Sequence, residues 1–157
     1  MGPIRRILFV CTGNICRSPL AEAVLRTKLA ERGADGRYEI DSAGTVTDHL
    51  GERSDPRMRR TAARRGVRID HRARRVTSAD MERFDLVIGM DDQHLNALRS
   101  LADGASVQVR KLGEFGDGDR APDVPDPWYG GMAGFERVYE MVDRSCEALA
   151  QWLEGRS

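Results

Sequence analysis

The stretch ILFVCTGNICRSP, residues 7–19, decides the fold of this chain. Its first four residues are continuously apolar, as in a parallel strand buried on both faces, and we expect a strand over residues 4–10. Gly13 permits backbone angles closed to other residues, Ser18 is a favourable N-cap, and Pro19 suits the first position of a helix. The stretch therefore predicts a strand, a loop beginning at Cys11, and a helix that follows directly.

The loop of residues 11–18, called here the phosphate-binding loop, has the composition of an anion site. Its backbone N–H groups and the positive end of the helix dipole point at one spot, which favours a bound anion. Arg17 adds a planar guanidinium able to bind two phosphate oxygens at once. Cys11 at the floor of the loop lies in a positive field that stabilises the nucleophilic thiolate. We interpret the loop as a phosphate site with a nucleophile; the alternative is a buried structural cysteine beside a surface arginine.

Strand-like runs and helical periodicity alternate along the rest of the chain, which indicates βαβ units. Strands are expected at residues 38–41, at 84–90 and around 107–109, and helices at 18–32, 57–65, 91–101 and 134–153. The prediction is an α/β fold with a single domain, residues 1–157, built on a four-stranded parallel sheet with helices on both faces. The site is expected at the carboxyl ends of the strands.

Composition narrows the class of protein. Lys plus Arg and Asp plus Glu number 25 each, so the overall charge gives no argument for nucleic acid or a membrane surface as partner. No run reaches transmembrane length and no signal-peptide pattern is seen, so we expect a cytoplasmic protein. The cysteines Cys11, Cys16 and Cys146 are too few for a disulfide scaffold and lack the paired spacing of a zinc site. Cys146 is expected in the core.

A second segment whose side chains suit a role in catalysis is Pro125 to Gly131, in a loop running from about Gly113. Phosphoryl transfer from a phenol needs a proton for the leaving oxygen, and Asp126 is the candidate acid. Trp128 and Tyr129 are placed to stack along an aromatic substrate. The alternative is a Pro-rich surface turn in which Asp126 accepts a hydrogen bond from a backbone amide.

Three segments together carry a resemblance to a known family: VCTGNICRSPLAE at 10–22, DSAGT at 41–45 and DPWYG at 126–130. In order and spacing they resemble the low-molecular-weight protein tyrosine phosphatases, over nearly the whole chain. The resemblance implies that Cys11 attacks phosphorus to form a phosphocysteine while Asp126 protonates the leaving tyrosine and later activates water. Arg17 and the loop amides would bind the phosphoryl oxygens. It implies no metal or cofactor, phosphotyrosine proteins as substrates, and phosphate or sulfate as a ligand.

The resemblance also assigns binding and supporting residues. Substrate or phosphate binding falls to Thr12, Gly13, Asn14, Ile15, Cys16, His49, Trp128 and Tyr129. Asn14, Ser18, Ser42 and His71 resemble the hydrogen-bonding set that holds the loop in shape, although Ser42 as a turn residue and His71 as a half-exposed loop histidine are alternatives. Cys16 resembles the family's second loop cysteine, which traps an oxidised Cys11 as a disulfide; its alternative is an apolar filler.

Some positions depart from the family pattern or have simpler interpretations. Asp48, followed by His49, stands where many relatives carry tryptophan, which predicts a more polar wall of the substrate crevice, and Trp128 stands where tyrosine is common. The arginine-rich tract 53–75 either attracts acidic phosphopeptides or forms a solvated helix face. N-capping fully explains Asp91, and His94 is expected to be solvated.

Three other functions are alternatives to tyrosine phosphatase. Arsenate reductases of this fold need further redox cysteines, and residues 80–90 contain none. Protein-arginine phosphatases have threonine where this chain has Ile15, whose apolar side chain suits a phenyl ring better than a guanidinium. A non-catalytic phosphate-binding module would not need Cys11, Arg17 and Asp126 together.

Overall fold

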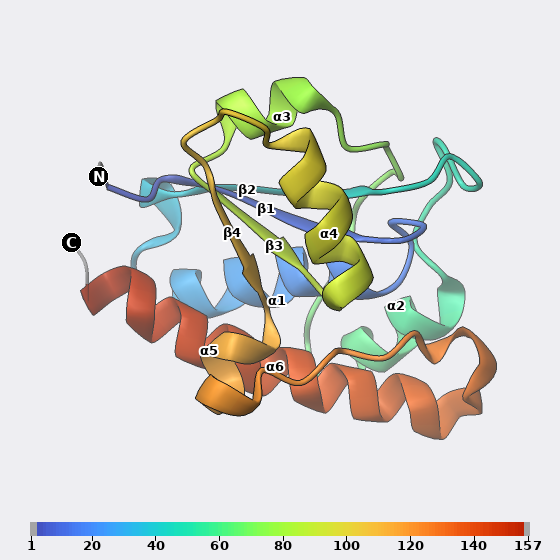
Figure 1. Cartoon of the computed structure of the whole chain (residues 1–157). Coiled ribbons are helices and arrows are strands. Elements are labelled where there is room, and N and C mark those ends of the chain that lie inside the picture. The colour runs from blue at the N-terminus through green and yellow to red at the C-terminus, as the bar shows by residue number, and fades with distance from the viewer. Residues whose placement is uncertain (1–2, 156–157) are drawn as a thin grey trace.

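The computed structural model describes residues 3–155, which contain a sheet of four strands in the order β2-β1-β3-β4 (Figure 1). The strands are β1 (Arg6–Cys11), β2 (Glu39–Gly44), β3 (Leu86–Gly89) and β4 (Gln108–Lys111). Every neighbouring pair is parallel, and Cys11 pairs with Gly44 in register. The predicted four-stranded parallel sheet is confirmed, and the carboxyl ends of its strands lie at one edge.

Helices cover both faces of the sheet (Figure 1). One face carries α1 (Arg17–Glu31), α2 (Pro56–Ala63), α5 (Gly113–Asp117) and α6 (Gly131–Gly155); the other carries α3 (Ser78–Arg83) and α4 (Asp92–Leu101). Three short 3₁₀ turns are η1 (Asp35–Arg37), η2 (Gly118–Arg120) and η3 (Pro127–Tyr129). Helices α3 and α5 were not predicted, because they span too few residues for helical periodicity to be recognised. Within residues 3–155, no helix combines the length and apolarity needed to cross a bilayer.

The apolar run of β1 faces two separate cores. Ile7 and Phe9 pack with α1 and α6, whereas Leu8 and Val10 pack with α3 and α4, and all four side chains are fully buried. Each such burial contributes about 1.5–3 kcal/mol, so β1 is fixed firmly from both sides. This anchoring matters for function because β1 ends on Cys11.

The start of α1 differs from the prediction. The helix begins at Arg17, its N-cap position is Cys16 with no side-chain capping bond, and Pro19 is its third residue. Ser18 is therefore not the N-cap, and that prediction was wrong. Pro19 is still tolerated because backbone N–H groups in the first helical turn have no intrahelical acceptor. The Ser18 hydroxyl is consequently available for a different partner.

Candidate active site

A cavity of about 360 Å³ opens at the carboxyl edge of the sheet, over the phosphate-binding loop. It brings together nine of the residues singled out from the sequence: Cys11, Thr12, Gly13, Ile15, Cys16, Arg17, His49, Asp126 and Trp128. Val46 and Asp48 complete the lining, and Asp48 gives the wall the polar character expected from the sequence. The side chain of Tyr129, also predicted here, lies outside the described part of the structure.

Cys11 is buried beneath the cavity, with 2% of its surface exposed. Its Sγ lies 2.9 Å from the Ser18 hydroxyl oxygen. That oxygen also accepts an N–H from the Asn14 amide at 2.8 Å, and the hydroxyl donates to the Ala43 carbonyl at 3.4 Å. The arrangement fixes the position of the Cys11 sulfur at the floor of the cavity.

Asn14 holds the loop from behind. Its amide nitrogen donates to the hydroxyls of Ser18 and Ser42, and its amide oxygen accepts from the His71 ring and the Arg74 backbone N–H, at 2.8–3.1 Å. This is the full hydrogen-bonding capacity of an asparagine side chain. The bonds fix a left-handed backbone with φ of 59°, a region in which asparagine is enriched. The loop is therefore rigid at its tightest point.

Gly44 allows the end of β2 to approach the loop closely. A Cβ at this position would lie 2.6 Å from the Thr12 carbonyl oxygen and 3.1 Å from Asn14. Ser42 lies inside β2 with no exposure, and not in a turn. The turn alternative for Ser42 was wrong because β2 extends beyond its predicted end.

Ser42 and His71 connect the loop to a buried carboxyl group. The Ser42 hydroxyl donates to Glu22 at 2.8 Å, and His71 Nδ1 lies 3.3 Å from the same carboxyl. Burial raises the pKa of Glu22 to about 7. Glu22, Asp41 and His71 each offer one potential metal-ligand atom, and these three atoms lie within 4.8 Å of one another. Arg26 forms an ion pair with Glu22. Because this arginine already supplies positive charge to the cluster, we assign the cluster to hydrogen bonding and not to metal binding.

Arg17 is buried, and its guanidinium is held by three groups. Nη1 donates to Asp91 at 3.3 Å and to the Val124 carbonyl at 3.0 Å, and Nη2 donates to the Thr12 hydroxyl at 3.3 Å. Asp91 caps α4 as predicted, accepting the His94 N–H. The view that capping explains Asp91 fully was wrong, because its second carboxylate oxygen binds Arg17.

Asp126 reaches the cavity from the opposite side. Its side chain is half-exposed at 51%, with one oxygen 3.9 Å from Arg17 Nη2. The other oxygen accepts the Trp128 backbone N–H at 3.0 Å, which is the bond that the surface-turn alternative describes. The carboxyl group thus both starts the η3 turn and faces the site.

Aromatic and cationic side chains form the outer wall. The rings of His49 and Trp128 lie 5.9 Å apart, and the Arg57 guanidinium stacks on Trp128 at 5.2 Å. Arg57 in turn pairs with Asp55 at 2.9 Å. At the inner rim, a Cβ at Gly13 would lie 2.9 Å from the His49 ring, so glycine leaves room for that ring. At least Arg57 in the arginine-rich tract therefore borders the site.

His94 lies behind the loop, and the expectation that it is solvated was wrong. Only 2% of its surface is exposed, and its Nε2 lies 2.9 Å from the Thr12 hydroxyl. Burial, reinforced by the charge of Arg17, lowers its pKa to about 4. The sequence signal was Asp91 three residues earlier, which places position 94 in the first helical turn, facing the sheet edge.

The two remaining cysteines are both buried thiols. Burial raises the pKa of Cys16 far above its ordinary value, assisted by the negative charge of Asp55. Burial does the same for Cys146, which is fully enclosed in the core as expected and donates weakly to the Ala21 carbonyl. No disulfide links any of the cysteines in the described chain, since Cys11, Cys16 and Cys146 are all free.

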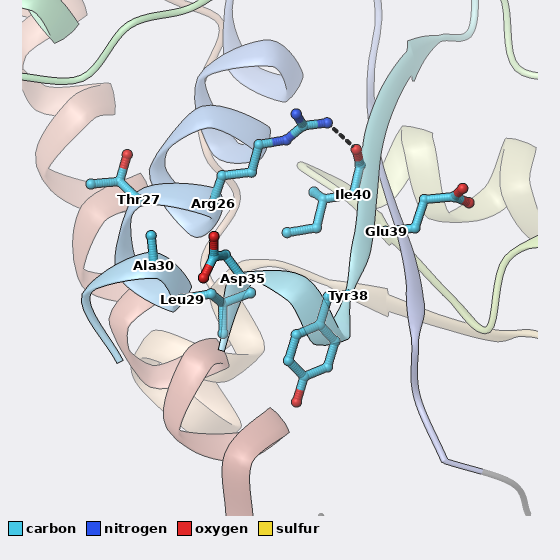
Figure 2. A pocket seen from close by; sticks show the side chains of 8 residues that line it. All are labelled: Arg26, Thr27, Leu29, Ala30, Asp35, Tyr38, Glu39 and Ile40. Carbon is cyan, nitrogen blue, oxygen red and sulfur yellow. Dashed lines mark hydrogen bonds between the residues drawn. The ribbon is translucent and has the colours of Figure 1, made fainter. Parts of the chain in front are cut away.

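A larger cavity of about 630 Å³ lies at the far end of α1, beside the start of β2 (Figure 2). Its lining includes Arg26, Asp35, Tyr38 and Glu39. The Arg26 guanidinium is occupied, since it donates to the Ile40 carbonyl and pairs with Glu22. Among the described residues, no cysteine lines this cavity, whereas Cys11 and Cys16 line the smaller one.

The fold and the site together define a class of phosphate-handling proteins. Its features are an α/β fold, a cysteine at a strand end, an arginine at the start of the next helix and a carboxyl group across the cavity. Comparison with known families is specific: residues 6–156 match the model of the low molecular weight phosphotyrosine protein phosphatases. The chain belongs to this family, which is a family of hydrolases.

Individual relatives agree with that membership. A low molecular weight protein-tyrosine-phosphatase of Streptomyces coelicolor is 43% identical, over 97% of this chain and 98% of its own. The crystal structure of a protein tyrosine phosphatase from Entamoeba histolytica superposes with a TM-score of 0.91 at 38% identity, covering 96% of this chain and 97% of that one. The Drosophila arginine phosphatase superposes with a TM-score of 0.86 at 30% identity, covering 93% and 96%.

Proposed function

We propose that the protein hydrolyses phosphotyrosine in proteins by way of a phosphocysteine, with Cys11 as nucleophile, Arg17 as phosphate-binding residue and Asp126 as general acid and base. The observation that carries the proposal is the cavity of about 360 Å³ that all three side chains line. The proposal extends to the single catalytic domain of residues 1–157.

In the first step the Cys11 thiolate attacks phosphorus, the S–P bond forms and the P–O bond to tyrosine breaks. Asp126 gives its proton to the leaving phenolate. In the second step Asp126 takes a proton from water, the water oxygen bonds to phosphorus, and the S–P bond breaks to release phosphate and the thiolate. The backbone N–H groups of residues 12–17 and Arg17 bind the equatorial oxygens throughout. Phosphate or sulfate would bind in the same place as a product-like ligand.

Tyrosine is favoured over arginine as the phosphorylated residue. Ile15, which lines the cavity with 7% exposure, offers an apolar surface that suits a phenyl ring and would leave a guanidinium without a partner. Trp128, at 40% exposure, is available for aromatic stacking at the rim. The relatives named as tyrosine phosphatases also exceed the arginine phosphatase in identity.

Several subsidiary roles belong to the same proposal. Asn14, Ser18, Ser42 and His71 keep the loop and the thiolate in place. Cys16 traps an oxidised Cys11 as a disulfide, which protects the nucleophile from further oxidation. The protein acts in the cytoplasm, where reducing conditions return that disulfide to thiols.

The test is phosphate release from matched phosphotyrosine, phosphoserine and phosphoarginine peptides with EDTA present, for the wild type, Cys11→Ser and Asp126→Asn. Tyrosine-selective turnover, lost with the first variant and strongly reduced with the second, is the expected result. Mass spectrometry after acid quenching should detect one phosphoryl group on Cys11. Preference for phosphoarginine would overturn the argument from Ile15, and tight phosphate binding without turnover would overturn the catalytic proposal.

A further inference from the structure

His94 lies in the first turn of α4, and its contacts fix the position of its ring proton. Ring nitrogen Nδ1 lies 3.2 Å from the Met90 backbone nitrogen and 3.3 Å from that of Asp91, and both N–H groups point at it. Asp91 Oδ1 is also 3.2 Å from Nδ1, but it already accepts the His94 backbone N–H. Two converging donors make Nδ1 an acceptor, so the proton of the neutral ring is on Nε2.

The ring therefore donates from Nε2 to the Thr12 hydroxyl oxygen, at 2.9 Å. The lowered pKa of His94 means that this donor is a neutral imidazole at neutral pH. The close approach depends on Gly89, because a Cβ at that position would lie 2.9 Å from the His94 Cβ. The end of β3 and the start of α4 thus press the ring against the phosphate-binding loop.

The Thr12 hydroxyl oxygen has two acceptor sites, and both are filled. One takes the N–H of His94, and the other takes an N–H from Arg17 Nη2 at 3.3 Å. The two Nη1 donors of Arg17 are already bound to Asp91 and to the Val124 carbonyl. What remains of the guanidinium is one edge, with the Nε–H and one Nη2–H, which is the fork that binds two phosphate oxygens.

We propose that His94 is a positioning residue for this reaction: by fixing the Thr12 hydroxyl as an acceptor, it holds the Arg17 guanidinium with its Nε–Nη2 edge toward the phosphoryl oxygens. The inference rests on the proposed function. Without His94, the threonine side chain is free to rotate and the Nη2 anchor weakens, while the anchors on Nη1 remain. The effect falls on the transition state, where the oxygens carry most charge.

The variants test the contacts of the two ring nitrogens of His94 separately. In His94→Asn, the side-chain oxygen stands near Nδ1 and keeps the cap on the Met90 and Asp91 N–H groups, but the side chain does not reach Thr12. In His94→Gln, the longer amide places an N–H near the position of Nε2. Thr12→Val removes the hydroxyl at nearly constant shape. Gln93→Asn, at an exposed position of the same helix, is the matched control.

Each variant is measured for kcat and KM with p-nitrophenyl phosphate, for direct binding of vanadate, a five-coordinate mimic, by titration calorimetry, and for thermal unfolding. We expect His94→Asn and Thr12→Val each to lose about tenfold in kcat and in vanadate affinity, the value of one charge-assisted hydrogen bond. The double variant should lose no more than either single one, and His94→Gln should recover to within about threefold of wild type.

Independent, multiplying losses in the double variant would overturn the proposal, as would unchanged kcat and vanadate affinity in His94→Asn. Equal losses in the Asn and Gln variants that follow a lowered Tm would assign His94 a merely structural role and would also overturn it. A wild type that turns over no phosphotyrosine defeats the proposed function instead, and the two failures are distinguishable because the vanadate measurement does not require turnover.

Discussion

The phosphate-binding loop and the segment of residues 121–130, called here the acid segment, face the same cavity but are built in opposite ways. Cys11 is 2% exposed and its loop is fixed by buried side-chain hydrogen bonds. The Asp126 side chain is 51% exposed and accepts a hydrogen bond from the Trp128 N–H, two residues along the segment. Tertiary contacts hold the nucleophile in its loop, whereas local turn chemistry orients the Asp126 carboxyl group within a segment that is anchored upstream.

The difference matches the roles proposed for the two groups. A nucleophilic thiolate and a phosphoryl group need dipoles that do not reorient during the reaction, which requires burial and full hydrogen bonding. An acid that protonates a leaving group and then deprotonates water must be reachable by both. The acid segment is accordingly tied down upstream of Asp126, where the Val124 N–H donates to the Met90 carbonyl at 2.8 Å and Lys111 binds Asp123 at 2.8 Å.

The largest effect should come from Cys11→Ser, because a serine hydroxyl is not ionised where the thiolate is. We expect kcat to fall by roughly 10⁴- to 10⁶-fold, with phosphate binding and Tm nearly unchanged. Steady-state kinetics with phosphotyrosine peptide and a thermal melt measure this. Residual activity above a few per cent would mean that the rigid loop does not hold the nucleophile.

Asp126→Asn should cost less, about 10²- to 10⁴-fold in kcat, since it removes proton transfer and leaves the loop intact. The loss should be largest for phenyl phosphate and smaller for p-nitrophenyl phosphate, whose leaving group needs less protonation. Kinetics with a series of aryl phosphates measures how the loss in kcat depends on the leaving group. Equal losses along the series would assign Asp126 a structural role in the η3 turn.

Asn14→Ala tests the rigidity of the loop itself. It removes four hydrogen bonds and places alanine at a φ of 59°, so we expect a loss of about 3–4 kcal/mol in the free energy of unfolding. Asn14→Gly removes the same bonds without the backbone strain and should recover about 1 kcal/mol of it. Urea unfolding measures both, and identical values for the two variants would show that the left-handed backbone carries no cost.

His94 makes the stability of the loop region depend on pH. Its pKa is about 4 in the folded protein and near 6.5 unfolded, so the unfolded state binds more protons between these values and stability falls as pH drops from 6.5 to 4. The loss is about 3 kcal/mol at most. The charges acting on the ring are Arg17, which opposes protonation, and Asp91, Asp123 and Asp126, which favour it. Urea titrations across this pH range should show that the free energy of unfolding depends less on pH in His94→Gln than in the wild type. The same pH dependence in both proteins would contradict the assignment.

The smallest effect concerns the anchor of the acid segment. Lys111 is nearly buried along its stem and binds both Asp92 at 2.9 Å and Asp123 at 2.8 Å. Lys111→Met keeps the stem and removes both ion pairs, so we expect kcat to fall about threefold with little change in Tm. Lys111→Arg, which keeps the charge, is the control. A loss as large as that of Asp126→Asn would mean that the acid segment is as preorganised as the loop.

Local sequence chemistry predicted some of these features and misassigned others. The apolar run of residues 7–10 marked β1 because that signal lies within the strand itself. Ser18 was misassigned as a cap because its partner, Cys11, is seven residues away across the loop. His94 was misassigned because nothing nearby in the sequence announces Thr12, 82 residues distant, as its partner.

The sequence by itself determined the order of the four strands and of the helices other than α3 and α5, the burial of β1 on both faces, and the placement of Cys11 and Arg17 in the loop between a strand and a helix. These depend on periodicity and on backbone preferences that act locally. Only the tertiary structure decided which side chains complete the site: Asn14 meets His71 and Arg74, and Arg17 meets Asp91 and Val124. The physical reason is that parallel strands bring their carboxyl ends to one edge, so distant loops converge there and burial requires their polar groups to find one another.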